Sequence, residues 1–293
     1  MNNLSVIVVF YDRLEELADC LDSLCSTECE VLVVDVSPTS SARVLVSGEA
    51  RYIQAAENRG YGWACNLGAG LSTGASLVIS NSDVVFAQNS LRGLLDVSSS
   101  QRSIVAPVQY DAGFVSAGVD SLLPLPGVKA SLSRWAWIGR RRQEALRSRS
   151  LATMLARGGV HPVGGLFGLS GACLAMSREV SDGLGGFDEE FFLYEEDVDL
   201  SLRAAANGVK LLLNSESAIA HESGTNSRGV NPSTLLTSIN SEAILWRKHN
   251  LGRQEILWLV QRAGLALRAA GSLLQGRWRD GQSYLTALSG RRP

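Results

Sequence analysis

The segment LSVIVVFYDRLEELADCLDSLCSTECEVLVVDVS, residues 4–37, indicates the class of fold. It begins with a short apolar run at 4–11 that is rich in β-branched residues, which is typical of a strand buried on both faces. Leucines at helical spacing follow in 12–24, and a second apolar run occupies 30–37. A strand, a helix and a strand in close succession predict two parallel strands joined by a crossover helix.

The alternation continues along the next part of the chain. Residues 51–57 predict a weaker third strand, 58–74 a glycine-rich loop that runs into a helix, and 76–86 a fourth strand interrupted by polar residues. This order predicts an α/β fold with a mostly parallel sheet flanked by helices. Ligands of such sheets bind at the carboxyl ends of the strands. Polar residues stand where those ends are expected, namely Tyr11, Asp12, Asp35, Ser37, Asn81, Ser82 and Asp83.

The pattern loosens after residue 105. A stretch with glycines, prolines, tryptophans and arginines at 110–165 predicts an excursion over the site, and the chain becomes helical in period from residue 237. We therefore expect a catalytic domain at 1–236 and a basic amphipathic helical tail at 237–293. Between them, 164–180 predicts a strand and a helix start, and 209–214 and 217–223 predict two short strands.

Composition limits the classes of protein that need to be considered. The chain is 45% hydrophobic and 19% charged, which is typical of a folded globular protein. Its net charge of −2 gives the whole molecule no affinity for nucleic acid, although residues 240–293 carry +6. Five cysteines without a CxxC pair favour free thiols in a reducing cytoplasm over disulfides or a zinc site. We expect no signal peptide and no spanning helix, because no segment offers about 18 apolar residues.

Four carboxylates are crowded into the segment FFLYEEDVDLSLR, residues 191–203. If the segment is helical, Asp199 and Arg203 form a stabilising pair one turn apart. Two interpretations of the other acids, Glu195, Glu196 and Asp197, stay open. A helix N-terminus favours negative charge, so the acids could serve the helix alone. A carboxylate at the mouth of an apolar pocket has a raised pKa, so one of them could instead act as a general base.

Other polar groups also allow two interpretations. Asp83 is either a turn residue or a ligand of Mg²⁺, which binds carboxylates together with substrate phosphates. His221 is either structural or a second metal ligand. The glycines of the 58–74 loop serve tight turns or let the backbone approach a phosphate. They lack the third glycine of GxGxxG, which argues against a dinucleotide-binding enzyme.

Taken together, these segments resemble the family 2 glycosyltransferases of GT-A fold, in particular the rhamnosyltransferase-like enzymes of bacterial surface polysaccharides. Residues 168–208 are the most specific part, and they are similar to the family's G-G-F-D-E-x-F-F-x-Y-x-E-D-x-D-L-x-x-R block. VLVVDVSPTSS resembles V-V-D-N-x-S-x-D, with Val36 in place of the asparagine. ENRGYGWACNLGA resembles N-x-G-[FY]-[AG]-x-[AG]-x-N-x-G, LVISNSDVVF resembles L-x-L-N-P-D, and AHESGTNS resembles H-x-x-[GS]-x-S.

The resemblance implies an inverting transfer of a sugar, with rhamnose from dTDP-rhamnose as the best match, to a saccharide or lipid-linked saccharide acceptor. By this likeness Asp197, in the pair with Glu196, is the general base. Asp83 and His221 would hold Mg²⁺ or Mn²⁺. The likeness and the strand-end positions together assign the nucleotide-diphosphate sugar to Tyr11, Asp12, Asp35, Asn58, Gly60, Asn66 and Ser82. Asp83 and Asp197 must then meet at one cleft.

Alternatives remain for the donor, for the activity and for the tail. The donor could be UDP-galactose, UDP-glucose or UDP-GlcNAc, and a catalytically silent sugar-binding module is a further reading. The tail either packs on the catalytic body or forms a homodimer, or it lies on the inner face of the cell membrane as a basic amphipathic segment.

Overall fold

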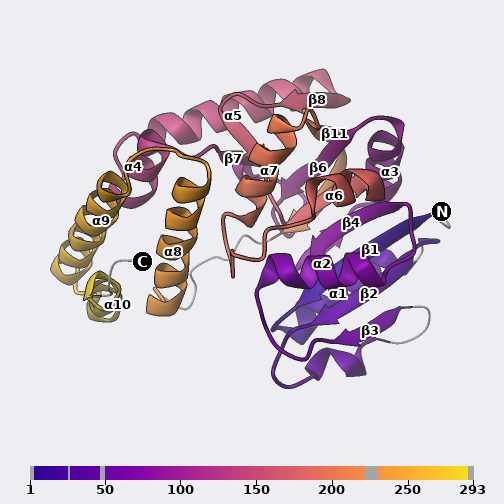
Figure 1. Cartoon of the computed structure of the whole chain (residues 1–293), viewed down its shortest axis with the longest axis horizontal. Helices are drawn as coiled ribbons and strands as arrows, with labels where there is room; N and C mark the ends of the chain where they lie inside the picture. Colours follow the sequence, from indigo (N-terminus) through magenta and orange to yellow (C-terminus); the bar gives the residue numbers. More distant parts are fainter. Residues whose placement is uncertain (1–2, 26, 47–49, 222–229, 290–293) are drawn as a thin grey trace.

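The computed structural model describes residues 3–25, 27–46, 50–221 and 230–289 (Figure 1). Its strands are β1 (Leu4–Phe10), β2 (Glu30–Asp35), β3 (Arg51–Gln54), β4 (Ser76–Asn81), β5 (Val84–Phe86), β6 (Ser103–Tyr110), β7 (Leu122–Pro124), β8 (Val160–Val163), β9 (Phe167–Leu169), β10 (Cys173–Ser177) and β11 (Lys210–His221). Its α-helices are α1 (Leu14–Leu24), α2 (Tyr61–Leu71), α3 (Ser90–Ser100), α4 (Val128–Ala136), α5 (Arg140–Arg157), α6 (Arg178–Leu184), α7 (Glu196–Ala206), α8 (Pro232–Lys248), α9 (Gln254–Leu274) and α10 (Trp278–Ser289).

A mixed sheet runs through the body of the molecule in the order β3-β2-β1-β4-β10-β6-β11-β5, with β8 paired to β11. The first four strands are parallel, as the sequence predicts. Strand β10 runs against both β4 and β6, and β11 is again parallel to β6. The start of β10 therefore lies at the same edge of the sheet as the carboxyl ends of β1, β4, β6 and β11. Residues distant in the sequence meet at this edge.

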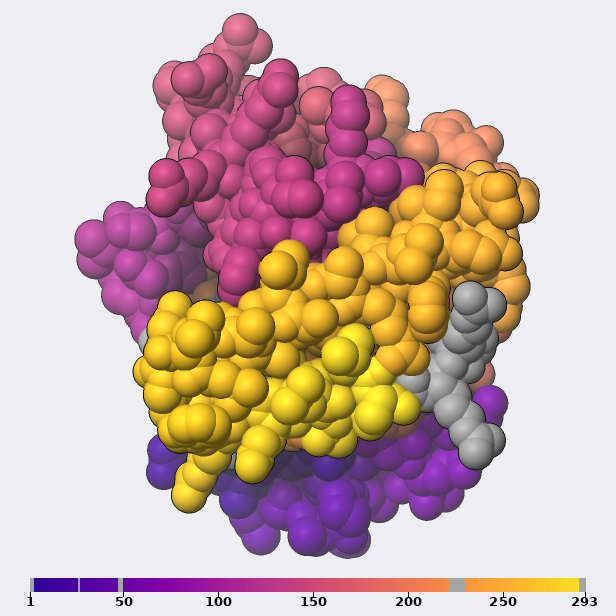
Figure 2. Space-filling view, turned by 90° about the vertical axis from the view of Figure 1, so that its left-hand side faces the viewer, coloured from indigo at the N-terminus to yellow at the C-terminus, as the bar shows by residue number. Residues whose placement is uncertain are grey.

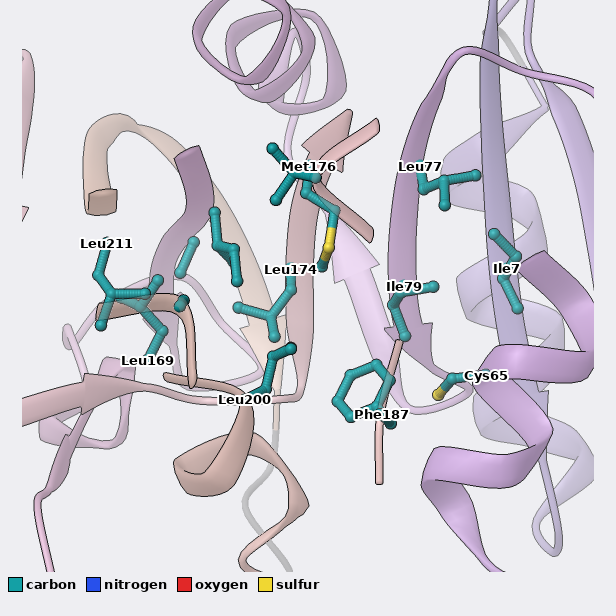
Figure 3. Close-up of a cluster of buried hydrophobic side chains, with 14 of the residues drawn as sticks. Ile7, Cys65, Leu77, Ile79, Leu169, Leu174, Met176, Phe187, Leu200 and Leu211 are labelled. Atoms are coloured by element: carbon teal, nitrogen blue, oxygen red, sulfur yellow. The ribbon is translucent and has the colours of Figure 1, made fainter. Parts of the chain in front are cut away.

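Both faces of the sheet are covered by helices. Alternate side chains of β1 point to opposite faces, so Val6 and Val8 pack with α1 and α3 while Ile7 and Val9 pack with α2, α6 and α7. Figure 3 shows side chains on the face to which Ile7 points. On this face Phe187 lies among side chains of α2, β4 and β10. This burial on both faces explains the continuous apolar runs in the strand sequences.

Three predicted strands have different bounds in the structure. The predicted fourth strand is divided into β4 and β5, with Ser82 and Asp83 in the turn between them. The two short strands predicted after residue 208 are one strand, β11, whose register shifts between Asn214 and Ala218. The Asn214 side chain bridges this irregularity by donating to Ser217 Oγ at 3.0 Å. Residues 222–229, which include most of the predicted AHESGTNS match, lie outside the described residues.

The C-terminal helices pack on the excursion rather than standing apart from it. Trp135 of α4 shares a small apolar core with Ile239, Leu265 and Ala287 of α8, α9 and α10. Helix α8 starts at Pro232, so the predicted boundary between 236 and 237 falls inside this helix. Among the described residues, no helix combines the length and the apolar character needed to cross a membrane.

The buried carboxylate of Asp199 fastens α7 to α8. It accepts hydrogen bonds from Arg203 Nε and His249 Nε2 and pairs with Lys248 Nζ, each at 2.7 Å. The predicted pair with Arg203 is therefore present. Burial alone would raise the pKa of Asp199, but the hydrogen bonds from Lys248, Arg203 and His249 outweigh it and lower this pKa.

We expect Asp199→Asn to lower the free energy of unfolding by about 3 kcal/mol, because it removes a fully buried charge that the half-buried Arg203 and Lys248 pair with. Since the folded-state pKa is lowered, this contribution is complete above the ordinary aspartate value of about 3.9 and is lost as the pH falls through the folded-state value. Urea unfolding at neutral and acidic pH measures both effects. The exposed Asp96→Asn serves as the control, and equal loss in both variants would contradict the assignment.

Candidate functional site

A cavity of about 640 Å³ opens at the carboxyl edge of the sheet. Its walls come from the ends of β1, β4 and β11, the start of β10, the loop before α2, the N-terminus of α7 and the start of α8. Nine of the residues predicted for the site line this cavity, namely Tyr11, Asp12, Asn58, Gly60, Ser82, Asp83, Glu196, Asp197 and His221.

The predicted site residues Asp35 and Asn66 do not line this cavity, and each holds a loop beside it. Asp35 is fully buried and accepts hydrogen bonds from Ser37 N at 2.8 Å and Tyr52 Oη at 2.9 Å. The Asn66 side chain donates to Phe187 O and accepts from Phe187 N, both at 2.9 Å. Their roles in the structure are to shape the walls.

On one wall, Asp83 faces His221. The two side chains come from the β4–β5 turn and the end of β11, and Asp83 Oδ1 lies 3.3 Å from His221 Nε2. Gln109 Oε1 lies 3.3 Å from His221 Nδ1. When Nδ1 donates to this carbonyl oxygen, a neutral ring directs an unprotonated Nε2 toward Asp83.

These two groups suit a divalent cation. Asp83 Oδ1 is buried, and no described residue donates a hydrogen bond to it, so with that tautomer two acceptor atoms face each other. A carboxylate oxygen and an imidazole nitrogen are both ligands of Mn²⁺, and Mg²⁺ also uses few protein ligands beside phosphate oxygens. In the described part of the chain, no group of three or more His, Cys, Asp or Glu side chains could hold a metal. A cation at Asp83 and His221 would thus take its other ligands from water or substrate.

The opposite group of acids lies at the N-terminus of α7. Asp197 Oδ2 accepts a hydrogen bond from Gly171 N at 2.8 Å, and Oδ1 accepts one from Val198 N at 2.8 Å. Burial raises the pKa of Asp197, and the two backbone donors oppose that shift. A Cβ at Gly171 would lie 3.0 Å from Asp197 Cβ, so the small residue allows this close approach. The side chain is held in one orientation with access to the cavity.

Glu196 and Glu195 have different surroundings. Glu196 Oε2 is buried without a partner, and burial followed by the neighbouring charge of Asp197 raises the pKa of Glu196 well above its ordinary value. Glu195 forms an ion pair with Arg134 of α4. Tyr194 and Glu195 both have positive φ, 69° and 66°, a strained conformation that turns the chain into α7.

The loop before α2 supports this acidic segment. Gly60 has φ 109°, and a Cβ there would lie 2.3 Å from Phe192 O. Tyr61 N donates to the same oxygen at 2.9 Å. Only glycine lets the two backbones approach in this way.

We expect Gly60→Ala to destabilise the protein by at least about 2 kcal/mol, because it adds both a forbidden φ and a clash with backbone. Gly70→Ala, inside the helix α2 that Gly60 precedes, is the control, since no described residue has an atom within 4 Å of a Cβ at Gly70. There the change should stabilise by roughly 0.5–1 kcal/mol. Denaturant unfolding of both variants measures the difference, and two variants of equal stability would refute the role of Gly60.

Several lining or supporting residues escape the sequence analysis. Gly171 contacts Asp197 and Arg134 contacts Glu195 because the fold brings together segments that are distant in the sequence. No local pattern indicates such contacts. Helix α8 contributes Ser233, Thr234 and Thr237 to the cavity. Its start carries a recognisable signal, because Asn231 caps the helix by accepting from Ser233 N at 2.9 Å and proline follows it.

Comparisons with known proteins agree with this architecture. The model of Glycosyl transferase family 2 matches residues 5–153, and that of Glycosyl transferase family group 2 matches residues 137–289. The chain is 27% identical to an N-acetylglucosaminyl-diphospho-decaprenol L-rhamnosyltransferase of Mycobacterium tuberculosis, over 98% of each chain. It is 25% identical to the low-salt glycan biosynthesis hexosyltransferase Agl10 of Haloferax volcanii, over 72% of this chain and 64% of the relative.

Solved structures show the same fold. The mannosyltransferase PcManGT from Pyrobaculum calidifontis, in complex with GDP-Man and Mn²⁺, superposes with a TM-score of 0.58 at 16% identity over 97% of this chain and 85% of that one. TarS residues 1–349 of S. aureus superposes with a TM-score of 0.51 at 14% identity over 99% and 81%. The predicted GT-A fold with a C-terminal helical extension is confirmed. With a family match over half of its length, the chain belongs to glycosyl transferase family 2 and is a glycosyltransferase.

Proposed function

We propose that this enzyme transfers L-rhamnose from dTDP-rhamnose to a lipid-linked saccharide, with inversion at the anomeric carbon. The observation that carries the proposal is that Asp83 and Asp197, more than a hundred positions apart in the sequence, line the same cavity. One acid sits beside His221 in a setting suited to a cation. The other is held by backbone donors in an orientation suited to a base.

The chemistry follows from these two environments. The acceptor hydroxyl oxygen attacks the anomeric carbon as the bond from that carbon to the diphosphate oxygen breaks. Asp197 takes the hydroxyl proton during the attack, which makes the oxygen a stronger nucleophile. Because attack and departure occur on opposite faces of the sugar, a single displacement inverts the centre. A divalent cation, Mg²⁺ or Mn²⁺, held by Asp83 and His221 would supply positive charge to the diphosphate leaving group.

The remaining walls suit the nucleotide and the sugar. Tyr11 and Asp12 at the end of β1, together with Asn58 and Gly60, are positioned to contact the nucleotide end of the donor. Tyr11 is 59% exposed, so its ring is available for stacking on a base. Asp35 acts from behind this wall by fixing the loop after β2.

The choice of donor and acceptor is supported by the mycobacterial relative, whose similarity extends over 98% of both chains. That protein is named for rhamnose transfer to an N-acetylglucosaminyl-diphospho-lipid. A lipid-linked acceptor would place the enzyme in the cytoplasm at the inner face of the cell membrane.

In the test, the purified enzyme is incubated with Mn²⁺ and a short-chain N-acetylglucosaminyl diphospholipid as the acceptor. Four donors are assayed in parallel, namely dTDP-rhamnose, UDP-galactose, UDP-glucose and UDP-GlcNAc. Mass spectrometry identifies the product, and NMR gives its anomeric configuration. We expect the deoxyhexose product from dTDP-rhamnose alone, with the configuration opposite to that of the donor. Transfer from a UDP-sugar instead would replace the donor assignment, retention would overturn the mechanism, and binding without turnover of any donor would favour a silent module.

A further inference from the structure

The outward face of helix α9 is apolar, and no described part of the chain covers it. Four large side chains on it are strongly exposed, at 41% for Ile256, 59% for Leu259, 57% for Leu267 and 89% for Leu274. The other exposed residues between them are the alanines at positions 263, 266 and 270. We call these seven residues the α9 stripe.

The α9 stripe lies opposite the packed side of the helix. At 100° per residue, the seven positions span an arc of about 100° that runs along the helix for about 27 Å. Leu257, Leu265 and Ala269 are buried and project to the other side, toward α4, α8 and α10. The only charged residues from 256 to 274, Arg262 and Arg268, lie outside the stripe. A helix that is apolar on both sides normally has both sides covered.

Exposed cations and a tryptophan lie at the two ends of the α9 stripe. Arg253 precedes the helix, and Arg277 and Arg279 follow it, all exposed. Trp278 is 66% exposed next to these arginines. Figure 2 shows α9 and α10 as a continuous orange and yellow band across one face of the molecule, with the excursion beside it.

We propose that the α9 stripe is the surface by which this enzyme lies on an anionic lipid bilayer. The stripe would enter the apolar boundary of the bilayer with the helix axis parallel to the membrane, because the opposite side of α9 is held by protein. Exposed arginines suit anionic headgroups, and tryptophan is favoured at the bilayer interface.

Charge distinguishes the bilayer from a second copy of the chain as the occupant. Residues 253–289 contain five arginines and two acids. Pairing this face with itself would bring two such basic rims together, which opposes association. A surface of anionic lipid has the complementary charge along its whole extent.

This inference deepens the proposed function, on which its biological meaning rests, because a lipid-linked acceptor lies in such a bilayer. The contact itself needs neither donor nor acceptor. It can therefore be tested separately from sugar transfer.

The test compares the full chain with Leu259→Ser/Leu267→Ser in co-sedimentation with phosphatidylcholine vesicles that contain or lack phosphatidylglycerol. Val44→Ser/Leu71→Ser is the matched control, since these side chains are 79% and 44% exposed on the catalytic body. We expect the stripe variant to lose at least about tenfold in partitioning to anionic vesicles, equivalent to about 1.4 kcal/mol. The control should bind as the unmodified chain does, and binding should weaken with salt. Thermal unfolding by circular dichroism establishes that each variant is folded.

The outcomes separate the alternatives. Equal partitioning of both variants, or no binding by the unmodified chain, overturns the proposal. Sedimentation velocity without vesicles tests whether a second copy of the chain covers the stripe. The proposal is also overturned if the unmodified chain and the control variant are dimers that do not bind vesicles, while the stripe variant is a monomer. Transfer to a water-soluble acceptor analogue should be unchanged in the stripe variant. Lost vesicle binding with intact transfer supports the membrane assignment, whereas absence of transfer in every variant speaks only against the proposed function.

Discussion

Replacing Asp197 by asparagine is expected to lower sugar transfer about a thousandfold while the affinity for the donor stays nearly unchanged. Asparagine keeps the shape of the side chain and one oxygen that can accept from Gly171 N, so the wall of the cavity should persist. The variant loses the capacity to take the acceptor proton and, because asparagine has one oxygen, one of the two backbone hydrogen bonds. Single-turnover assays measure transfer, and isothermal titration calorimetry with Mn²⁺ measures donor binding.

The pH dependence gives this prediction a second readout. Because burial raises the pKa of Asp197, transfer by the unmodified enzyme should fall on acidification at a pH above the ordinary aspartate value of about 3.9. The base is active when ionised, so the rate rises with pH through that titration. In Asp197→Asn this dependence should vanish. Persistence of the same pH profile in the variant would assign the titration to another group.

Glu196→Gln separates the two neighbouring acids. Burial, followed by the charge of Asp197, raises the pKa of Glu196 well above its ordinary value, so we expect a proton shared by the pair to reside on Glu196. A neutral amide resembles the protonated carboxyl in shape and charge, so transfer should fall less than about tenfold. Asp96→Asn, an exposed carboxylate on α3, is the control for charge loss alone. A large loss in Glu196→Gln with little loss in Asp197→Asn would exchange the roles.

The sequence predicts the sheet because β1, β2 and β4 are buried on both faces and α1 has a clear apolar period. This information is local, and β1, β2, β3 and β4 follow it. The insertion of β10 against β4 and β6 is not local, since it depends on pairing between strands almost a hundred residues apart. The two short strands predicted after residue 208 form the single strand β11 because both pair with β6, which is also distant in the sequence.

The site shows the same division. Asp83, Asp197 and His221 could be proposed because strand ends and family motifs mark them in the sequence. The sequence could not predict that Asp35 and Asn66 hold loops beside the cavity, because the same polar residue can either face a ligand or hold a loop. Arg134 was missed because its partner Glu195 is reached only through the packing of α4 against the C-terminal helices. Long-range packing thus determines which polar residues face the cavity.

Replacing Asp83 by asparagine should affect the donor rather than the acceptor proton. Asp83 supplies the carboxylate charge beside His221, so its loss should weaken Mn²⁺-dependent donor binding about a hundredfold, equivalent to about 2.7 kcal/mol. Transfer should fall by at least the same factor at subsaturating donor. Calorimetry with dTDP-rhamnose, with Mn²⁺ and then with EDTA, measures binding independently of turnover.

The decisive comparison is the loss of donor affinity on adding EDTA, measured for the unmodified enzyme and for Asp83→Asn. The unmodified enzyme should lose most donor affinity in EDTA, whereas Asp83→Asn should respond little, because the group that holds the cation is already weakened. Asp22→Asn, an exposed carboxylate on α1, should behave as the unmodified enzyme. If EDTA leaves donor affinity and transfer of the unmodified enzyme intact, Asp83 does not hold a cation. Asp197→Asn should keep the full response to Mn²⁺, because its defect lies in the proton transfer.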